Sequence, residues 1–71
     1  MNEDVYKHVR ITGTSSTSSD DAVNNAINTV AKTIDEINWF RVIETRGYIH
    51  NKVIAYWQVT VEVGFKIKPQ E

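Results

Sequence analysis

Residues 53–67 read VIAYWQVTVEVGFKI, the most regular stretch of the 71-residue sequence. Every second position from Val53 onward is apolar, which is typical of a β-strand with one face buried against a core. At ~3.3 Å per residue the strand spans roughly 50 Å, so we expect it to curl at Gly64 to remain under a single helix. Gln58 falls on the opposite, outer face, and Pro69 ends the strand.

Two other segments have β patterns. Residues 5–12 alternate with Val9 and Ile11 on the apolar side, and we expect Gly13 to break this strand. Residues 39–49 form the second predicted strand, followed by a hairpin turn at 50–52. Counting by parity places Trp39 and Arg46 on opposite sides of that strand, and neither side is uniformly polar or apolar. We therefore expect each face of this strand to contact another surface, which fits an oligomer better than a monomer. Gly47 predicts a bulge or a close backbone approach.

The segment between these strands predicts one amphipathic helix, from about Ser19 to Ile34. Its apolar residues recur three and four positions apart and form a single stripe: Ala22, Val23, Ala26, Ile27, Val30, Ala31 and Ile34. Ser18 is the expected N-cap, with Asp21 completing a capping box. The predicted fold is α+β: one domain over residues 1–71, β-α-β-β, with a three-stranded antiparallel sheet wrapped around the helix.

The composition predicts a protein that depends on a partner. A domain of this size buries only ~60% of its unfolded surface. It has no cysteine, so no disulfide can compensate. Aromatic and apolar side chains also remain on the outer sheet face, which favours oligomerisation.

Charge and sequence length exclude several function classes. The net charge of −1, from 8 basic and 9 acidic residues, argues against a nucleic-acid partner. No apolar run is long enough for a membrane span. The acidic start is unlike a signal peptide, so we expect a cytoplasmic protein. His8 and His50 lack metal-ligand spacing, and His8 is interpreted as a solvent-facing strand residue. We find no catalytic constellation.

Three residues can be interpreted as ligand-binding groups, and each also has a simpler structural interpretation. Trp39 is either a core or interface anchor or a platform on which a planar ligand stacks. Gln58 is either a solvated strand residue or an amide that donates to and accepts from a ligand. Arg46 either forms a surface ion pair with Glu44 or Glu62, or contacts a phosphate.

Short motifs along nearly the whole chain resemble those of the dodecin family. They are Val5-Tyr6-Lys7, Gly13-Thr14-Ser15, Asp21-Ala22, Asn38-Trp39-Phe40 with Glu44 and Arg46-Gly47, Gln58-Val59, and Gly64-Phe65. The resemblance implies the same β-α-β-β fold and a hollow homododecamer of four trimers with cubic symmetry. It also implies two stacked flavins at each two-fold interface between subunits.

The resemblance gives the three candidate residues specific roles. Trp39 is expected to stack on the flavin ring, Gln58 to hydrogen-bond its polar edge, and Arg46 to lie near the phosphate of flavin mononucleotide (FMN). FMN is therefore the expected cofactor, with riboflavin and other flavins as alternatives. Coenzyme A is a further candidate ligand that we assign to no residue. The implied role is non-enzymatic: flavin storage or buffering, with quenching of flavin photochemistry.

Two other functions remain as alternatives. A flavin-dependent oxidoreductase requires an open substrate cavity beside the ring, and a single-stranded nucleic-acid binder would use the aromatic outer face. The sequence also departs from the family pattern at three positions. Trp57 stands where tyrosine is usual, and Arg41 and Arg10 stand where acidic residues are common. The first departure bears on packing, and the other two bear on subunit contacts.

Overall fold

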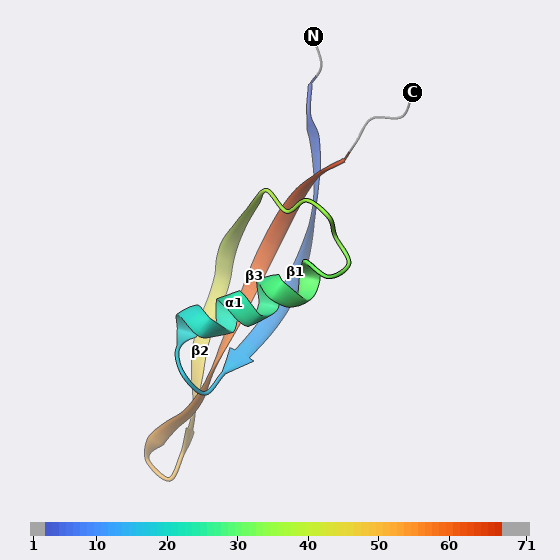
Figure 1. The fold of residues 1–71 in the computed structure, drawn as a ribbon. Helices are drawn as coiled ribbons and strands as arrows, with labels where there is room; N and C mark the ends of the chain where they lie inside the picture. The colour runs from blue at the N-terminus through green and yellow to red at the C-terminus, as the bar shows by residue number, and fades with distance from the viewer. Residues whose placement is uncertain (1–2, 68–71) are drawn as a thin grey trace.

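The computed structural model describes residues 3–67 and confirms the predicted α+β fold. The elements are β1 (Val5–Ser15), α1 (Ser19–Val30), β2 (Trp39–His50) and β3 (Val53–Ile67). They form one sheet with the order β1-β3-β2, in which both strand pairs are antiparallel (Figure 1). Because β3 is the central strand, its side chains determine what lies at the middle of both sheet faces.

The core lies between β3 and α1, which crosses one face of the sheet (Figure 1). It consists of small and β-branched side chains: Ala22, Ala26, Val59, Val61 and Val63. Trp57 packs against this cluster, as its position in the alternating pattern predicted. The alanines allow the helix backbone to lie close to the sheet, so a thin core suffices.

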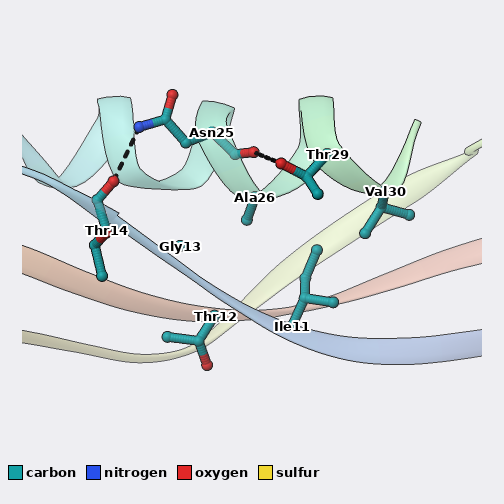
Figure 2. A pocket seen from close by; sticks show the side chains of 8 residues that line it. All are labelled: Ile11, Thr12, Gly13, Thr14, Asn25, Ala26, Thr29 and Val30. Atoms are coloured by element: carbon teal, nitrogen blue, oxygen red, sulfur yellow. Dashed lines mark hydrogen bonds between the residues drawn. The ribbon is translucent and has the colours of Figure 1, made fainter. Parts of the chain in front are cut away.

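Gly13 permits that close approach and does not break the first strand. It is buried within β1 and pairs with Val59. A Cβ atom added to Gly13 would overlap with the carbonyl oxygen of Ala22 and lie 2.9 Å from the Ala26 Cβ. The prediction of a strand break was therefore wrong, because Gly13 lies under the helix at Ala26 (Figure 2) and the strand continues to Ser15.

An open groove of about 520 Å³ runs between β1 and α1 (Figure 2). Two polar contacts cross or border it: the Asn25 amide donates to the Thr14 carbonyl, and the Thr29 hydroxyl donates to the Asn25 carbonyl. The first bond fastens α1 to the end of β1, and the second lies within the helix. None of Trp39, Arg46 and Gln58 lines the groove.

The start of α1 is capped as predicted, with one difference. The Ser18 hydroxyl accepts from the backbone N–H of Asp21 at 3.0 Å. The Asp21 carboxylate, however, accepts a hydrogen bond from the Ser15 hydroxyl at 2.7 Å, and it is Ser15 that accepts from the Ser18 N–H. The end of β1 thus completes the cap in place of a reciprocal capping box.

The helix ends at Val30, four residues earlier than predicted. Ala31 is its C-cap, and the N–H groups of Lys32 and Thr33 donate to carbonyls three residues back. This tighter bonding closes the last turn and satisfies carbonyls that would otherwise lack partners. Ala31 is consequently exposed, although the apolar stripe had included it.

The molecule is long and thin, with extents of 57 × 20 × 13 Å. Its radius of gyration is 15.1 Å, against about 11 Å for a compact domain of this length. The expectation that β3 curls under the helix was therefore wrong: the β2–β3 hairpin stays extended and projects past α1 (Figure 1). Asn51 and Lys52 form its turn with φ of 53° and 68°, as a two-residue hairpin requires.

The projecting hairpin exposes apolar side chains that one subunit cannot cover. Ile49 is 75% exposed, and Val53 and Ile54 are also more than half exposed. Every residue of β2 is exposed in the single subunit, so contact of both its faces with another surface stays a prediction. Such surface favours assembly with other subunits. Among residues 3–67, no helix is long and apolar enough to cross a membrane.

Candidate functional site

The candidate residues lie on the outer face, which we define as the sheet face opposite α1. Strand pairing determines its members, because directly paired residues project to the same side. From β1 they are Tyr6, His8, Arg10, Thr12 and Thr14; from β2, Trp39, Arg41, Glu44, Arg46 and Tyr48; from β3, Tyr56, Gln58, Thr60, Glu62, Gly64 and Lys66. This face is polar and aromatic, and it contains all three predicted ligand-binding residues.

A β-bulge brings Trp39 and Arg46 to the same face. Val42 pairs with Val61 and Glu44 pairs with Thr60, so Ile43 is an extra residue in β2. The insertion reverses the alternation beyond it, which corrects the prediction that Trp39 and Arg46 lie on opposite sides. The bulge or close backbone approach predicted at Gly47 is not found within the subunit: Gly47 pairs in register with Trp57 and has only ordinary contacts there, and a second register shift lies just beyond it, between Tyr48 and Ile49.

Trp39 lies flat over the backbone of Gly64. A Cβ atom on Gly64 would overlap with atoms of the indole ring, so only glycine leaves room for it. Asn38 fixes this arrangement, because its N–H donates to the Gly64 carbonyl and its side-chain oxygen accepts from the Lys66 N–H, both at 2.9 Å. Trp39 is 38% exposed. The ring therefore offers its uncovered side to a ligand or a partner.

Arg46 makes three hydrogen bonds within the chain. Its Nε and Nη2 donate to the Glu44 carboxylate, and its Nη1 donates to the Tyr48 hydroxyl at 3.3 Å. These hydrogen bonds raise the pKa of Arg46 above its ordinary value, the bond to the Glu44 carboxylate having the largest effect. The Tyr48 ring in turn stacks on Tyr56 with ring centroids 4.9 Å apart. A phosphate at Arg46 would have to compete with Glu44.

Glu62 is at the centre of a charge cluster that joins all three strands. Its carboxylate accepts from Arg41 Nε at 2.9 Å and contacts His8 Nδ1 at 3.0 Å and Arg10 Nη2 at 3.5 Å. The hydrogen bond from Arg41 lowers the pKa of Glu62 the most; burial opposes this effect, and His8 and Arg10 reinforce it. The His8 ring also lies 6.2 Å from the Trp39 ring, centroid to centroid.

Gln58 and Arg46 are paired neighbours, but Trp39 is remote from both within one subunit. Arg46 pairs with Gln58, and Trp39 pairs with Gly64, six residues further along β3. At ~3.3 Å per residue that separation is roughly 20 Å. A single chain therefore cannot bring Trp39 and Gln58 to the same small ligand. A site that uses both residues needs a second subunit.

The family of the chain follows from comparison with known proteins. A model of the dodecin family matches residues 5–68. The chain belongs to the dodecin family. A dodecin from Thermus thermophilus is 38% identical over 64 residues, which cover 90% of this chain and 93% of the relative. Membership supports a small, self-assembling protein of a family whose members are generally binding proteins rather than enzymes.

Solved structures of dodecins share this fold. Dodecin from Streptomyces davaonensis superposes with a TM-score of 0.88 at 38% identity, covering 96% of this chain and all of that chain. Calcium dodecin from Mycobacterium tuberculosis is 33% identical over 67 residues, which cover 94% of each chain. Its structure, described as having a novel calcium-binding site, superposes with a TM-score of 0.77. Among residues 3–67 of the present chain, we find no group of three or more His, Cys, Asp or Glu side chains arranged to hold a metal ion.

The sequence did not disclose the Glu62 cluster. His8 was interpreted as a solvent-facing strand residue, and its side chain is indeed 53% exposed, but it also contacts Glu62 and lies near the Trp39 ring. Arg41 and Arg10 were flagged only as departures that bear on subunit contacts, whereas both pair with Glu62 of the same chain. One sequence feature could have revealed the cluster. Alternation along their strands places His8, Arg10 and Arg41 on the outward-facing side, and both strands pair with β3.

Proposed function

We propose that this dodecin binds and stores a flavin without catalysing a reaction, as a homododecamer built from trimers. FMN is the first ligand that we propose, with riboflavin as the alternative. The observation that supports this best is the Trp39 indole, which lies over Gly64 and leaves the residue 38% exposed. A planar aromatic ligand complements such a partly exposed platform.

The contacts of Trp39 fit a stacked ring. Gly64 supports one side of the indole, and Asn38 fixes the backbone on either side of that contact. Stacking on one aromatic side contributes about 1–3 kcal/mol, judged by the stacking of nucleic-acid bases on aromatic residues. Two Trp39 side chains related by a two-fold axis would enclose a pair of stacked flavins between them. In that arrangement the site exists only in the assembled protein.

Gln58 and Arg46 would then reach the ligand from the neighbouring subunit. The Gln58 amide offers two donors and an acceptor, which match the imide-like edge of a flavin ring. Arg46 lies beside Gln58 on the adjacent strand and is proposed as a second contact in this region. Because Glu44 and Tyr48 hold the Arg46 side chain in place, it can meet the ligand at little cost in side-chain entropy.

Stacking against Trp39 also accounts for the proposed quenching. A bound flavin supplies a photoexcitable ring, and an electron-rich indole in van der Waals contact with it offers a route for rapid electron transfer. A ring covered on both sides has little room for a substrate. These features favour storage with protection over the alternative of a flavin-dependent oxidoreductase.

Titration of the purified protein with FMN and riboflavin, followed by flavin fluorescence, tests the proposal. We expect quenching on binding and elution at the size of a dodecamer. Trp39→Ala should weaken binding roughly 5- to 150-fold, equivalent to the loss of about 1–3 kcal/mol. Trp57→Phe is the matched control, because Trp57 packs on the helix side of the sheet and should leave affinity unchanged.

Undiminished affinity of an assembled Trp39→Ala protein would remove the stacking proposal. Turnover of a reduced nicotinamide by the flavin-loaded protein would favour the oxidoreductase. Coenzyme A and calcium chloride are added in parallel titrations, because the first is a further candidate ligand and a relative is called calcium dodecin.

A further inference from the structure

His8 and Trp39 lean toward each other across Gly64 of the central strand. Both residues pair with Gly64, His8 from β1 and Trp39 from β2, and both project to the outer face. The two strands that flank a central strand are about 10 Å apart. The centroids of the two rings nevertheless lie only 6.2 Å apart, with their planes tilted by 41°. Because Gly64 has no side chain, β3 places no group between the rings.

Glu62 holds the imidazole of His8 and determines which nitrogen can take up a proton. His8 Nδ1 lies 3.0 Å from the Glu62 carboxylate, and the Glu62 side chain is only 8% exposed. An ionised carboxylate can only accept a hydrogen bond, so neutral His8 carries its hydrogen on Nδ1 and gains its second proton at Nε2. The His8 side chain is 53% exposed, so that proton can come from solvent. Protonation therefore changes the charge of the ring without breaking the contact that holds it.

His8 is the group beside Trp39 that can change the charge of this surface near neutral pH. The titratable and charged groups around it on the outer face come from all three strands: Tyr6, Arg10, Arg41, Glu62 and Lys66, with Asp4 paired to Lys66. Histidine is the only side-chain type among these whose ordinary charge change falls between pH 5 and 8. Two arginines face one glutamate, so the cluster carries one net positive charge when His8 is neutral and two when it is protonated.

We propose that His8 regulates Trp39 in response to pH: protonation of His8 makes the indole a poorer electron donor and so weakens quenching of a flavin stacked on it. This inference rests on the proposed function. In quenching, the Trp39 indole gives one electron to the photoexcited ring and recovers it by the reverse transfer, so no other reactant is consumed. The indole is a radical cation between the two transfers. An imidazolium 6.2 Å from the indole opposes the formation of that cation by electrostatic repulsion, whereas a neutral imidazole does not.

The ligand-free protein gives the first test, because its fluorescence reports the coupling of His8 and Trp39 directly. In Trp57→Phe protein, Trp39 is the one remaining tryptophan. Its fluorescence should fall with a single transition between pH 8 and pH 5, since a protonated imidazole accepts an electron from an excited indole more readily than a neutral one. Adding His8→Gln should abolish this transition. Adding His50→Gln, which removes the other histidine of the chain, is the matched control and should leave it in place.

The riboflavin-loaded protein tests the consequence for quenching. Riboflavin is the probe because it lacks the phosphate, whose second ionisation falls in the same pH range. The fluorescence lifetime of bound riboflavin should be about 2-fold or more longer at pH 5 than at pH 8. His8→Gln should keep the short lifetime at both pH values. His8→Lys, which is charged throughout this range, should have the longer lifetime at both. If only FMN binds, the same variants are compared with FMN, because its phosphate titrates equally in all of them.

The outcomes separate this inference from the proposed function. A bound-flavin lifetime that stays constant from pH 8 to pH 5 would overturn the inference and leave flavin storage intact. A pH dependence that persists in assembled His8→Gln protein, or that disappears in His50→Gln, would also overturn it. Failure of the wild-type protein to bind either FMN or riboflavin would remove the proposed function and the role of His8 in quenching together. Sizing chromatography of every variant at both pH values confirms that the compared proteins are assembled.

Discussion

The indole of Trp39 lies against the backbone of Gly64 on the neighbouring strand, and only a residue without Cβ leaves room for it. This contact explains why a glycine occupies a central strand that is otherwise rich in valine. Glycine weakens a strand, so its presence there marks a close approach. It supports an exposed aromatic ring rather than a bend, since Gly64 has no positive φ and pairs regularly with both neighbouring strands.

Substitution of this glycine should disturb the platform without altering any polar group. In Gly64→Ala, the new Cβ would overlap with the Trp39 ring, so the indole must tilt away from the sheet. We expect flavin affinity to fall about 10-fold, a loss of roughly 1.4 kcal/mol of stacking. Gly47→Ala is the matched control, because its nearest contact would be an ordinary 3.7 Å from the Trp57 ring. Equal affinities of the two variants, measured by fluorescence titration, would contradict this account of Gly64.

The sequence predicted the elements well but misplaced the faces of β2. Alternation in residues 53–67 identified β3, and the helical stripe identified α1, because both patterns are local. The side on which Trp39 and Arg46 lie depends instead on the extra residue Ile43. That bulge arises from pairing with β3, which is distant in sequence, so counting along β2 alone could not reveal it.

The charge cluster was hidden for a similar reason. Arg10, Arg41 and Glu62 lie on three different strands, and only their register places the three side chains together. The sequence showed that two positions often occupied by acids carry arginine. It did not show that the compensating acid, Glu62, lies between them on the central strand.

Glu62 should contribute stability that depends on pH in a defined direction. Its pKa is lowered in the folded protein from an ordinary 4.5, chiefly by Arg41. Stability from such a group is present above the unfolded pKa and is lost as the pH falls through the folded pKa. The free energy of unfolding should therefore decline below about pH 4.5. Glu62→Gln should destabilise the protein at pH 7, and its difference from wild type should shrink as the pH is lowered.

The measurement is denaturant unfolding at a fixed subunit concentration, because assembly couples stability to concentration. Glu44→Gln is the control, since Glu44 is an exposed partner of Arg46 and surface ion pairs contribute only about 0–1 kcal/mol. A difference between Glu62→Gln and wild type that stays constant from pH 7 to pH 3 would show that the ionised carboxylate is not what stabilises the sheet.

Separation of Trp39 from Gln58 by roughly 20 Å within one subunit leads to a test of the shared site. If each ligand meets Trp39 of one subunit and Gln58 of another, Trp39→Ala and Gln58→Ala subunits should complement each other. At a mixed two-fold interface, one of the two sites then has both native residues and the other has neither. Co-refolding equal amounts should restore strong binding at a fraction of the sites, with affinity close to wild type, whereas each variant refolded alone should bind weakly. A mixture whose titration equals the average of the two separate variants would place both residues in the same subunit's site, which the extended shape of β3 does not allow.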